Sequence, residues 1–208
     1  MMLTCLKENA SAVGFELKPK IISCDFEKGA IKAFKHHFPG VKILGCHFHF
    51  TSAINKKIGD LGLKIVYVGE NRIEKFTTWV RMLMAFPSLL LDDIDEVWEE
   101  MIDSKPDLGE HNSQLEKFIE YFADTWINET CHFPRDLWNM FDVYSSRTNN
   151  ISETYNHAIN GQVMNSKSNV FKILDLTQKQ ETLASVKYER VNLGNEKKQS
   201  SSQNHLSI

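Results

Sequence analysis

Cysteines, long apolar runs and surplus positive charge are all scarce in this chain of 208 residues. The four cysteines form no C-x-x-C pair, which indicates reduced thiols in the cytosol or the nucleus rather than a disulfide framework. No stretch approaches the roughly 20 apolar residues of a membrane span. No secretory signal is visible either, so we expect a protein that is neither membrane-embedded nor secreted.

The net charge of −3 and the pI of about 6.2 do not indicate nucleic-acid binding. Such binding would have to rest on local basic residues, and the candidates for phosphate contact are Lys56, Lys57, Arg147 and Lys167. A solvated surface explains each of them singly just as well. With 42% apolar residues and 13 Phe, the chain can build one large domain, or a domain with an insertion.

The first part of the chain predicts a strand–helix–strand unit. Apolar runs at 20–25 and 41–46 flank a helical pattern at 27–38, which Pro39 and Gly40 end. This length fits a right-handed crossover between parallel strands. Because both runs are almost wholly apolar, we expect the strands to lie in a sheet covered on both faces.

From about 47 to 141 the pattern is helical, and only 64–68 reads as a further strand. Asn71 and Glu74 have the spacing of a capping box. The four Trp fall on helix patterns and are predicted to be core. A longer helix is expected at 169–191, followed by a polar, disordered tail from 194 to 208.

Asp25 is the first candidate for chemistry, since it follows a buried strand. Ligands and metals gather at the carboxyl ends of parallel strands, and carboxylates hold Mg²⁺. An alternative is that Asp25 caps the next helix. Glu27 is a rival metal ligand, although the first turn of a helix also favours a glutamate through the helix dipole.

Glu153 is the second candidate acid, with its own alternative. Asn150 and Glu153 have capping-box spacing, so Glu153 could simply bond to the backbone of its helix. Two carboxylates that meet in space would instead hold divalent ions for an in-line displacement at phosphorus.

Cys46 and His49 form a C-x-x-H pair directly after the second strand. They could supply half of a zinc site, with Cys131 and His132 as the other half. The alternative is a buried cysteine that ends a strand and a histidine that is hydrogen-bonded nearby. A nucleophilic Cys–His pair is less favoured, because no third orienting residue can be named.

The chain resembles the transposase domain of Mutator-like elements, a branch of the DDE transposases with a ribonuclease-H-like fold. Matching pieces occur in family order over about residues 15–190. They are Ile22-Ser-Cys-Asp-Phe-Glu-Lys-Gly-Ala30, Phe38-Pro39, Gly45-Cys-His-Phe-His49, Leu83-Met-Ala-Phe-Pro87, Tyr121-Phe-Ala-Asp-Thr-Trp-Ile127, Phe133-Pro134, Trp138-Asn139 and Arg147-Thr-Asn-Asn-Ile-Ser-Glu153.

The resemblance implies roles for these residues. Asp25 corresponds to the second acid of the catalytic triad and Glu153 to the third, and both would bind Mg²⁺ or Mn²⁺. Cys46 and His49 correspond to the C-x-x-H motif of this branch. The implied partner is transposon-end DNA.

The implied fold is α/β: a partial ribonuclease-H-like core that carries a large all-helical insertion, predominantly helical overall. The domains would be 1–50 and 146–193 for the core, 51–145 for the insertion, and 194–208 for the tail.

One departure from the family concerns its first acid, which lies on an early strand. Only 24 residues precede Asp25, and none of them is an Asp. We therefore expect a fragment in which the opening strands and the first metal ligand are missing, and which is inactive as a transposase. An uncovered apolar strand edge would favour self-association into a homo-oligomer.

Two other functions stay open at this point. The first is a non-catalytic module in which the helical middle binds DNA or a protein. The second is a structural domain stabilised by zinc.

Overall fold

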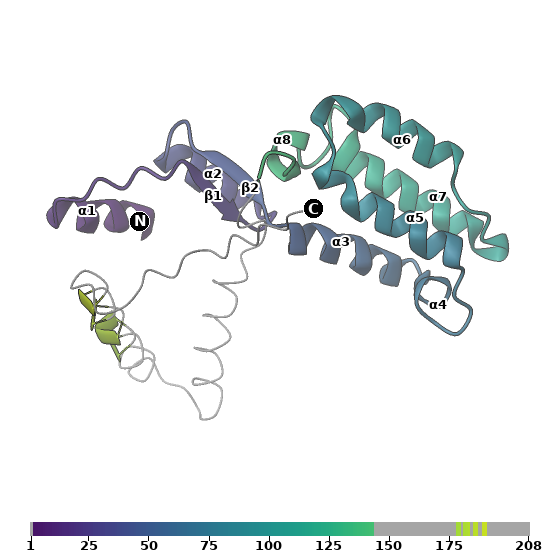
Figure 1. The fold of residues 1–208 in the computed structure, drawn as a ribbon, viewed down its shortest axis with the longest axis horizontal. Helices are drawn as coiled ribbons and strands as arrows, with labels where there is room; N and C mark the ends of the chain where they lie inside the picture. The colour runs from purple at the N-terminus through teal and green to yellow at the C-terminus, as the bar shows by residue number, and fades with distance from the viewer. Residues whose placement is uncertain (1, 144–177, 180, 184, 187–188, 191–208) are drawn as a thin grey trace, which may run out of the picture. The chain divides into compact units, whose positions relative to one another are not determined.

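The computed structural model describes most of the chain (Figure 1). The described residues are 2–143, 178–179, 181–183, 185–186 and 189–190. The chain divides into two units, Met1–Asn149 and Asn150–Ile208. All described residues of the second unit are helical, in agreement with the predicted helix there. Several predictions concern residues that lie outside the described part. These are the candidate acid Glu153 with its capping partner Asn150, the basic residues Arg147 and Lys167, and the tail from 194 to 208.

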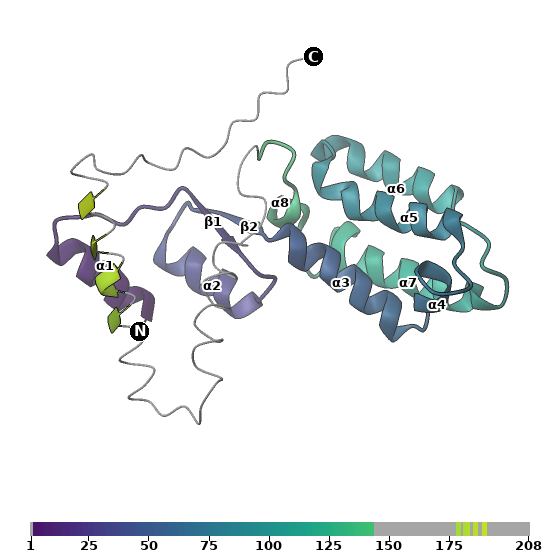
Figure 2. The same ribbon diagram turned by 60° about the horizontal axis from the view of Figure 1, so that its bottom comes forward.

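The predicted strand–helix–strand unit is present in the first unit. Strand β1 (Ile21–Cys24) pairs in parallel with β2 (Lys42–Gly45), and helix α2 (Lys28–His37) connects them and packs on both strands, as Figure 2 shows. The register places Cys24 opposite Gly45, so the two strands end side by side. Helix α1 (Met2–Ala12) precedes β1 and contains no buried residue.

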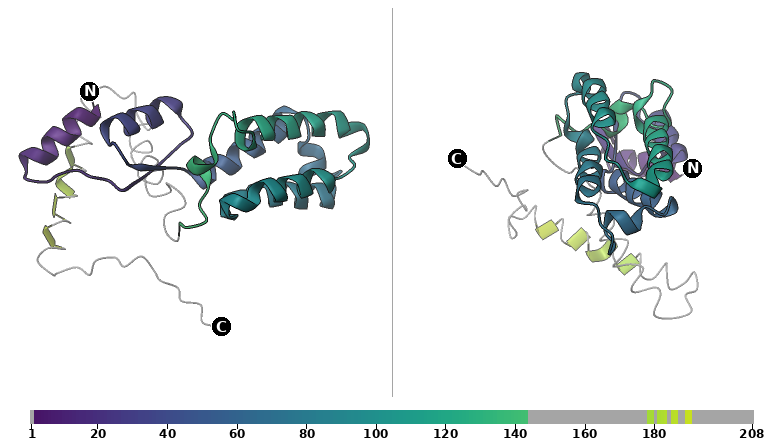
Figure 3. Two further views of the ribbon diagram at one scale, coloured as in Figure 1. Left: turned by 90° about the horizontal axis from the view of Figure 1, so that it is seen from above. Right: turned by 90° about the vertical axis from the view of Figure 1, so that its right-hand side faces the viewer.

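The remainder of the first unit is helical. Helices α3, α5, α6 and α7 run alongside one another (Figures 1 and 3). In chain order the elements are α3 (His47–Asp60), α4 (Lys64–Tyr67), α5 (Glu74–Ala85), η1 (Phe86–Ser88), η2 (Leu91–Asp93), α6 (Ile94–Asp103), η3 (Gly109–His111), α7 (Asn112–Phe122), the π-helical turn η4 (Ala123–Ile127) and α8 (Arg135–Trp138).

The main core lies between these helices. Its buried side chains come from every helix from α3 to α8 and include five phenylalanines and three of the four tryptophans. Trp98 is only partly buried and packs against this core. The prediction that the tryptophans are core residues is therefore confirmed. A small second cluster joins Leu44 of β2 to Met140 and Val143, after α8.

Three predictions of local structure are wrong. The segment 64–68 forms helix α4 rather than a strand, because Leu63 and Val66 are buried in the helical core. Helix α5 has Ile73 as its N-cap, and no side chain caps it, so the predicted capping box does not form. Strand β1 is not covered on both faces in the described structure, since Ile21 is 53% exposed and no β1 residue is buried.

No helix in the described part of the chain has the length and apolar character needed to cross a lipid bilayer.

Candidate functional site

Asp25 lies at the carboxyl edge of the β1–β2 sheet, immediately after β1. The backbone N–H of Cys46 donates to the carbonyl of Cys24 at 2.9 Å, which continues the pairing to the last residue of β1. The side chain of Asp25 is 52% exposed. The N-cap of α2 is Glu27, whose side chain makes no capping hydrogen bond, so Asp25 sits two residues before the helix cap rather than at it.

His49 is directed at Asp25 by the start of helix α3. Cys46 is the N-cap of this helix, and His49 follows one turn later on the same side. His49 Nδ1 lies 3.1 Å from Asp25 Oδ1, which is within ion-pair distance. The structure thus joins two candidates that the sequence had left separate.

Cys46 is buried and does not line the cavity beside Asp25, although it shares the C-x-x-H motif with His49. It is fully buried at the junction of β2 and α3. The neighbouring thiol of Cys24 has its pKa raised to about 11, first by burial and then by the charges of Asp25 and Cys46. Cys24 is therefore a neutral thiol at physiological pH and a poor nucleophile.

A cavity of about 440 Å³ adjoins the Asp25–His49 pair. Three of its lining residues are ionisable: Asp25, Glu27 and His49. The others are four aromatic residues, which we call the aromatic wall (Phe26, Tyr121, Trp126 and Phe133), together with Ala53 and Thr125. We call this space the Asp25 cavity.

The aromatic wall is held by edge-to-face and stacked contacts. The ring of Phe26 lies 4.9 Å from Trp126 and 5.1 Å from Phe133, centroid to centroid, and Trp126 stacks on Phe133 at 5.3 Å. These contacts anchor the segment after β1 to the helical core. Burial raises the pKa of Tyr121, so its hydroxyl stays protonated.

Gly45 is a residue of this site that the sequence analysis missed. A Cβ at this position would overlap the ring carbons of Phe26. Only glycine at the end of β2 therefore lets Phe26 lie between the sheet and Trp126. The glycine just before the C-x-x-H motif was the available signal.

The described residues contain no group of three or more His, Cys, Asp and Glu side chains able to hold a metal ion. A four-ligand zinc site is consequently not assembled among them. Cys131 Sγ instead donates to the carbonyl of Phe133 at 3.1 Å, and His132 Nδ1 lies 3.2 Å from the carbonyl of Asp124. Magnesium makes smaller demands, because one or two carboxylates with water and substrate oxygens suffice. Asp25 and Glu27, which line the same cavity, fit that requirement.

The two described lysines predicted to contact DNA differ in their surroundings. Lys56 is exposed on α3. Lys57 is half-buried, with Nζ 4.8 Å from the ring centroid of Tyr121, a cation–π contact at the wall of the Asp25 cavity.

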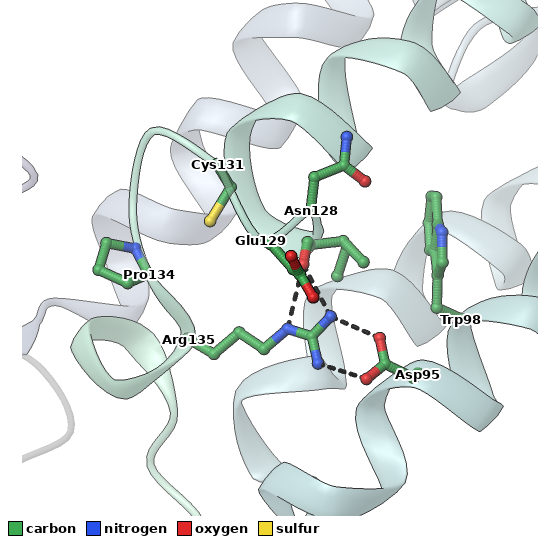
Figure 4. Close-up of a pocket in the computed structure, with 8 residues that line it drawn as sticks. Asp95, Trp98, Asn128, Glu129, Cys131, Pro134 and Arg135 are labelled. Carbon is green, nitrogen blue, oxygen red and sulfur yellow. Dashed lines mark hydrogen bonds and ion pairs between the residues drawn. The ribbon is translucent and has the colours of Figure 1, made fainter.

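A second cavity of about 730 Å³ lies between α6, η4 and α8, and the sequence analysis did not identify it. The guanidinium of Arg135 donates to the carboxylate of Asp95, as Figure 4 shows, and also to the carbonyl of Ile127. The Arg135 hydrogen bond and charge lower the pKa of Asp95. Arg135 therefore joins α6 to the end of η4, and we call this arrangement the Arg135 clamp. Because the guanidinium is already bonded to Asp95 and Ile127, we do not regard this cavity as an anion-binding site.

No protein-family model, no curated protein and no solved structure matches this chain.

Proposed function

We propose that this chain is a domain related to Mutator-like transposases, with an ancestral activity of divalent-ion-dependent DNA cleavage and strand transfer. The observation that carries the proposal is the Asp25–His49 pair at the carboxyl edge of a parallel sheet, beside a cavity. This is where open α/β folds place ligands. The proposed core is ribonuclease-H-like, and the helices from α3 to α8 correspond to its insertion.

Asp25 and His49 each have a proposed task at this corner. Asp25 supplies a carboxylate oxygen to Mg²⁺ or Mn²⁺. Glu153, which lies outside the described residues, is the second acid that the resemblance implies. His49, whose Nδ1 lies 3.1 Å from Asp25 Oδ1, positions the Asp25 carboxylate. The bound ion would supply charge stabilisation for in-line displacement at phosphorus.

The metal site is tested with Mn²⁺ as a paramagnetic probe on the full chain. We expect Asp25→Asn to weaken Mn²⁺ binding by about tenfold or more, because it removes the ligand's charge. His49→Gln should weaken binding less. Asp103→Asn, an exposed acid on α6, is the matched control and should leave binding unchanged. Equal Mn²⁺ affinity in Asp25→Asn and the unsubstituted chain would refute the site.

DNA cleavage is tested separately on labelled transposon-end oligonucleotides with Mg²⁺ or Mn²⁺. Any cleavage should be lost in Asp25→Ala and in Glu153→Ala. Cleavage that persists in both variants would refute the assignment of the acids. DNA binding that is indifferent to divalent ions and to both substitutions would favour a non-catalytic binding module instead.

A further inference from the structure

The charges of the first unit are distributed unevenly along the chain. Residues 2–46, which contain the sheet and α2, carry seven lysines and four acids. Residues 47–143, which form the helical part, carry nine Lys and Arg but eighteen acids. The near-neutral balance of the whole chain therefore hides a basic region beside an acidic one, and an anionic polymer would be drawn to the former.

Helix α2 concentrates this positive charge. Its sequence, KGAIKAFKHH, contains no acid. Lys28, Lys32 and Lys35 are exposed and follow i, i+4, i+7 spacing, so they share one face of the helix. The side chains of Ile31 and Phe34 are half-buried, on the side that packs on the strands.

The three lysines are not engaged by acids. In the described part of the chain none of them forms an ion pair, whereas Lys18, Lys105 and Arg135 each do. A lysine face within a solvated, mixed surface would have acidic neighbours at helical spacing. The α2 face has no such acidic neighbours within the helix, so its positive charge is available to bind an anionic partner.

Further positive groups gather at the end of α2. Lys7 of α1 donates to the carbonyl of His37 at 2.9 Å, and its Nζ lies 5.4 Å from the ring centroid of Phe38. The pKa of His37 is lowered, by desolvation and then by its positive neighbours, which include His36 and Lys7. The positive potential thus extends along the whole helix.

The other end of the lysine face meets the Asp25 cavity. Lys28 Nζ lies 5.9 Å from the ring centroid of Phe133, which lines that cavity with Asp25. From Lys28 to Lys35 the helix advances by about 10 Å, at about 1.5 Å per residue. One DNA strand carries a phosphate about every 3.4 Å along the duplex axis, so this length matches about three phosphates.

From these observations we infer that the Lys28–Lys32–Lys35 face of α2 is the surface that docks the DNA backbone and leads one strand to Asp25. The inference rests on the proposed function for the identity of the polymer, and it adds a contact surface that the sequence analysis did not name. Cation binding at Asp25 would let the next phosphate approach this carboxylate without charge repulsion.

The inference is tested by fluorescence anisotropy of labelled single-stranded and duplex DNA with the full chain, in EDTA, at 50 to 200 mM KCl. The triple variant Lys28→Gln, Lys32→Gln, Lys35→Gln should lose at least tenfold in affinity at the lowest salt. For three phosphate contacts, the slope of log K against log salt should shrink by about 2 for single strands and about 2.7 for duplex.

A matched triple variant, Lys64→Gln, Lys75→Gln, Lys117→Gln, removes the same charge from exposed positions on the helical part. It should retain most of the affinity. Circular dichroism and melting verify that both variants fold. Equal losses in the two variants, or no loss in the α2 variant, would overturn the inference. So would an unsubstituted chain that binds neither form of DNA, or polyglutamate that competes as well as DNA.

The outcome is separable from that of the proposed function. In EDTA, Asp25→Asn should bind DNA at least as tightly as the unsubstituted chain, since it leaves the α2 lysines in place and removes a carboxylate that repels phosphate. If the α2 variant binds DNA normally while Asp25→Asn still loses Mn²⁺, the docking surface is wrong and the metal site stands. If Asp25→Asn still binds Mn²⁺ while the α2 variant loses DNA binding, the metal site is wrong and the docking surface stands.

Discussion

The helical part of the first unit, 47–143, and its sheet part, 2–46, differ sharply in burial. The helical part holds a continuous aromatic core, whereas the sheet part has only four buried apolar residues, which are Phe38, Ile43, Leu44 and Cys46. Two short strands alone are at best marginally stable. The sheet part therefore depends on Phe26, which packs against the helical core, and on Leu44, which packs with Met140 and Val143 after α8.

The helical part therefore supplies most of the buried core, whereas the proposed metal ligand lies in the sheet part. Asp25 and the α2 lysines lie on the thin, exposed part, while His49 and all of the aromatic wall except Phe26 belong to the helical part. A site that spans a rigid core and a thin, exposed element has one firm side and one that can open locally. The variants below test whether the two parts differ in this way.

The largest effect is expected from Phe50→Ala in the helical part. Phe50 is 1% exposed, and its ring lies 4.7 Å from Trp126 and 5.6 Å from Trp138. The cavity left behind should cost about 3–5 kcal/mol in the free energy of unfolding, measured by urea denaturation. Phe48→Ala, in the same helix but 49% exposed, is the control and should cost far less. Similar losses in both would mean that the aromatic core is not where stability resides.

A smaller effect is expected in the sheet part from Gly45→Ala. The added methyl group must displace the Phe26 ring, at a cost of about 1–3 kcal/mol, and should also weaken Mn²⁺ binding at Asp25. Gly59→Ala is the control, because it lies in α3 with no atom within 4 Å of the new Cβ. That substitution should stabilise by about 0.5–1 kcal/mol through helix propensity. A Gly45→Ala chain as stable as the unsubstituted one would contradict the tight sheet-to-core contact.

The smallest effect concerns the Arg135 clamp and depends on pH. Arg135 lowers the pKa of Asp95 in the folded state, so the stability that this pair contributes is present above the unfolded pKa of about 4. It is lost as the pH falls through the lower folded value. Asp95→Asn should therefore melt at a lower temperature than the unsubstituted chain at pH 7, by a modest amount because Asp95 is 70% exposed.

The difference in melting temperature should shrink as the pH falls from about 4 and should close below the lowered folded pKa of Asp95, where this carboxyl group is neutral in the folded and the unfolded chain alike. Asp136→Asn supplies the control, since Asp136 is exposed on α8 next to Arg135 in sequence. A difference that persists in strong acid would mean that the clamp acts through packing alone.

Several features of the site were predictable because they depend on nearest neighbours in sequence. The strand–helix–strand unit follows from two apolar runs around an amphipathic helix, and the Pro39–Gly40 break ends that helix. Asp25 and Cys46 were identified because they directly follow strands, and His49 because it completes the C-x-x-H pair with Cys46. The assignment of 64–68 failed because Ile65, Val66 and Tyr67 favour strands, while burial of Val66 against the helical core selects a helix.

Periodicity and the order of apolar runs alone determined that this chain forms a parallel pair of strands followed by a helical region with an aromatic core. Only the tertiary structure decided that His49 contacts Asp25, that Gly45 makes room for Phe26, and that Arg135 bridges to Asp95 across 40 positions of sequence. The reason is physical. Local patterns record what each segment buries, whereas a contact between distant side chains depends on how the segments pack together.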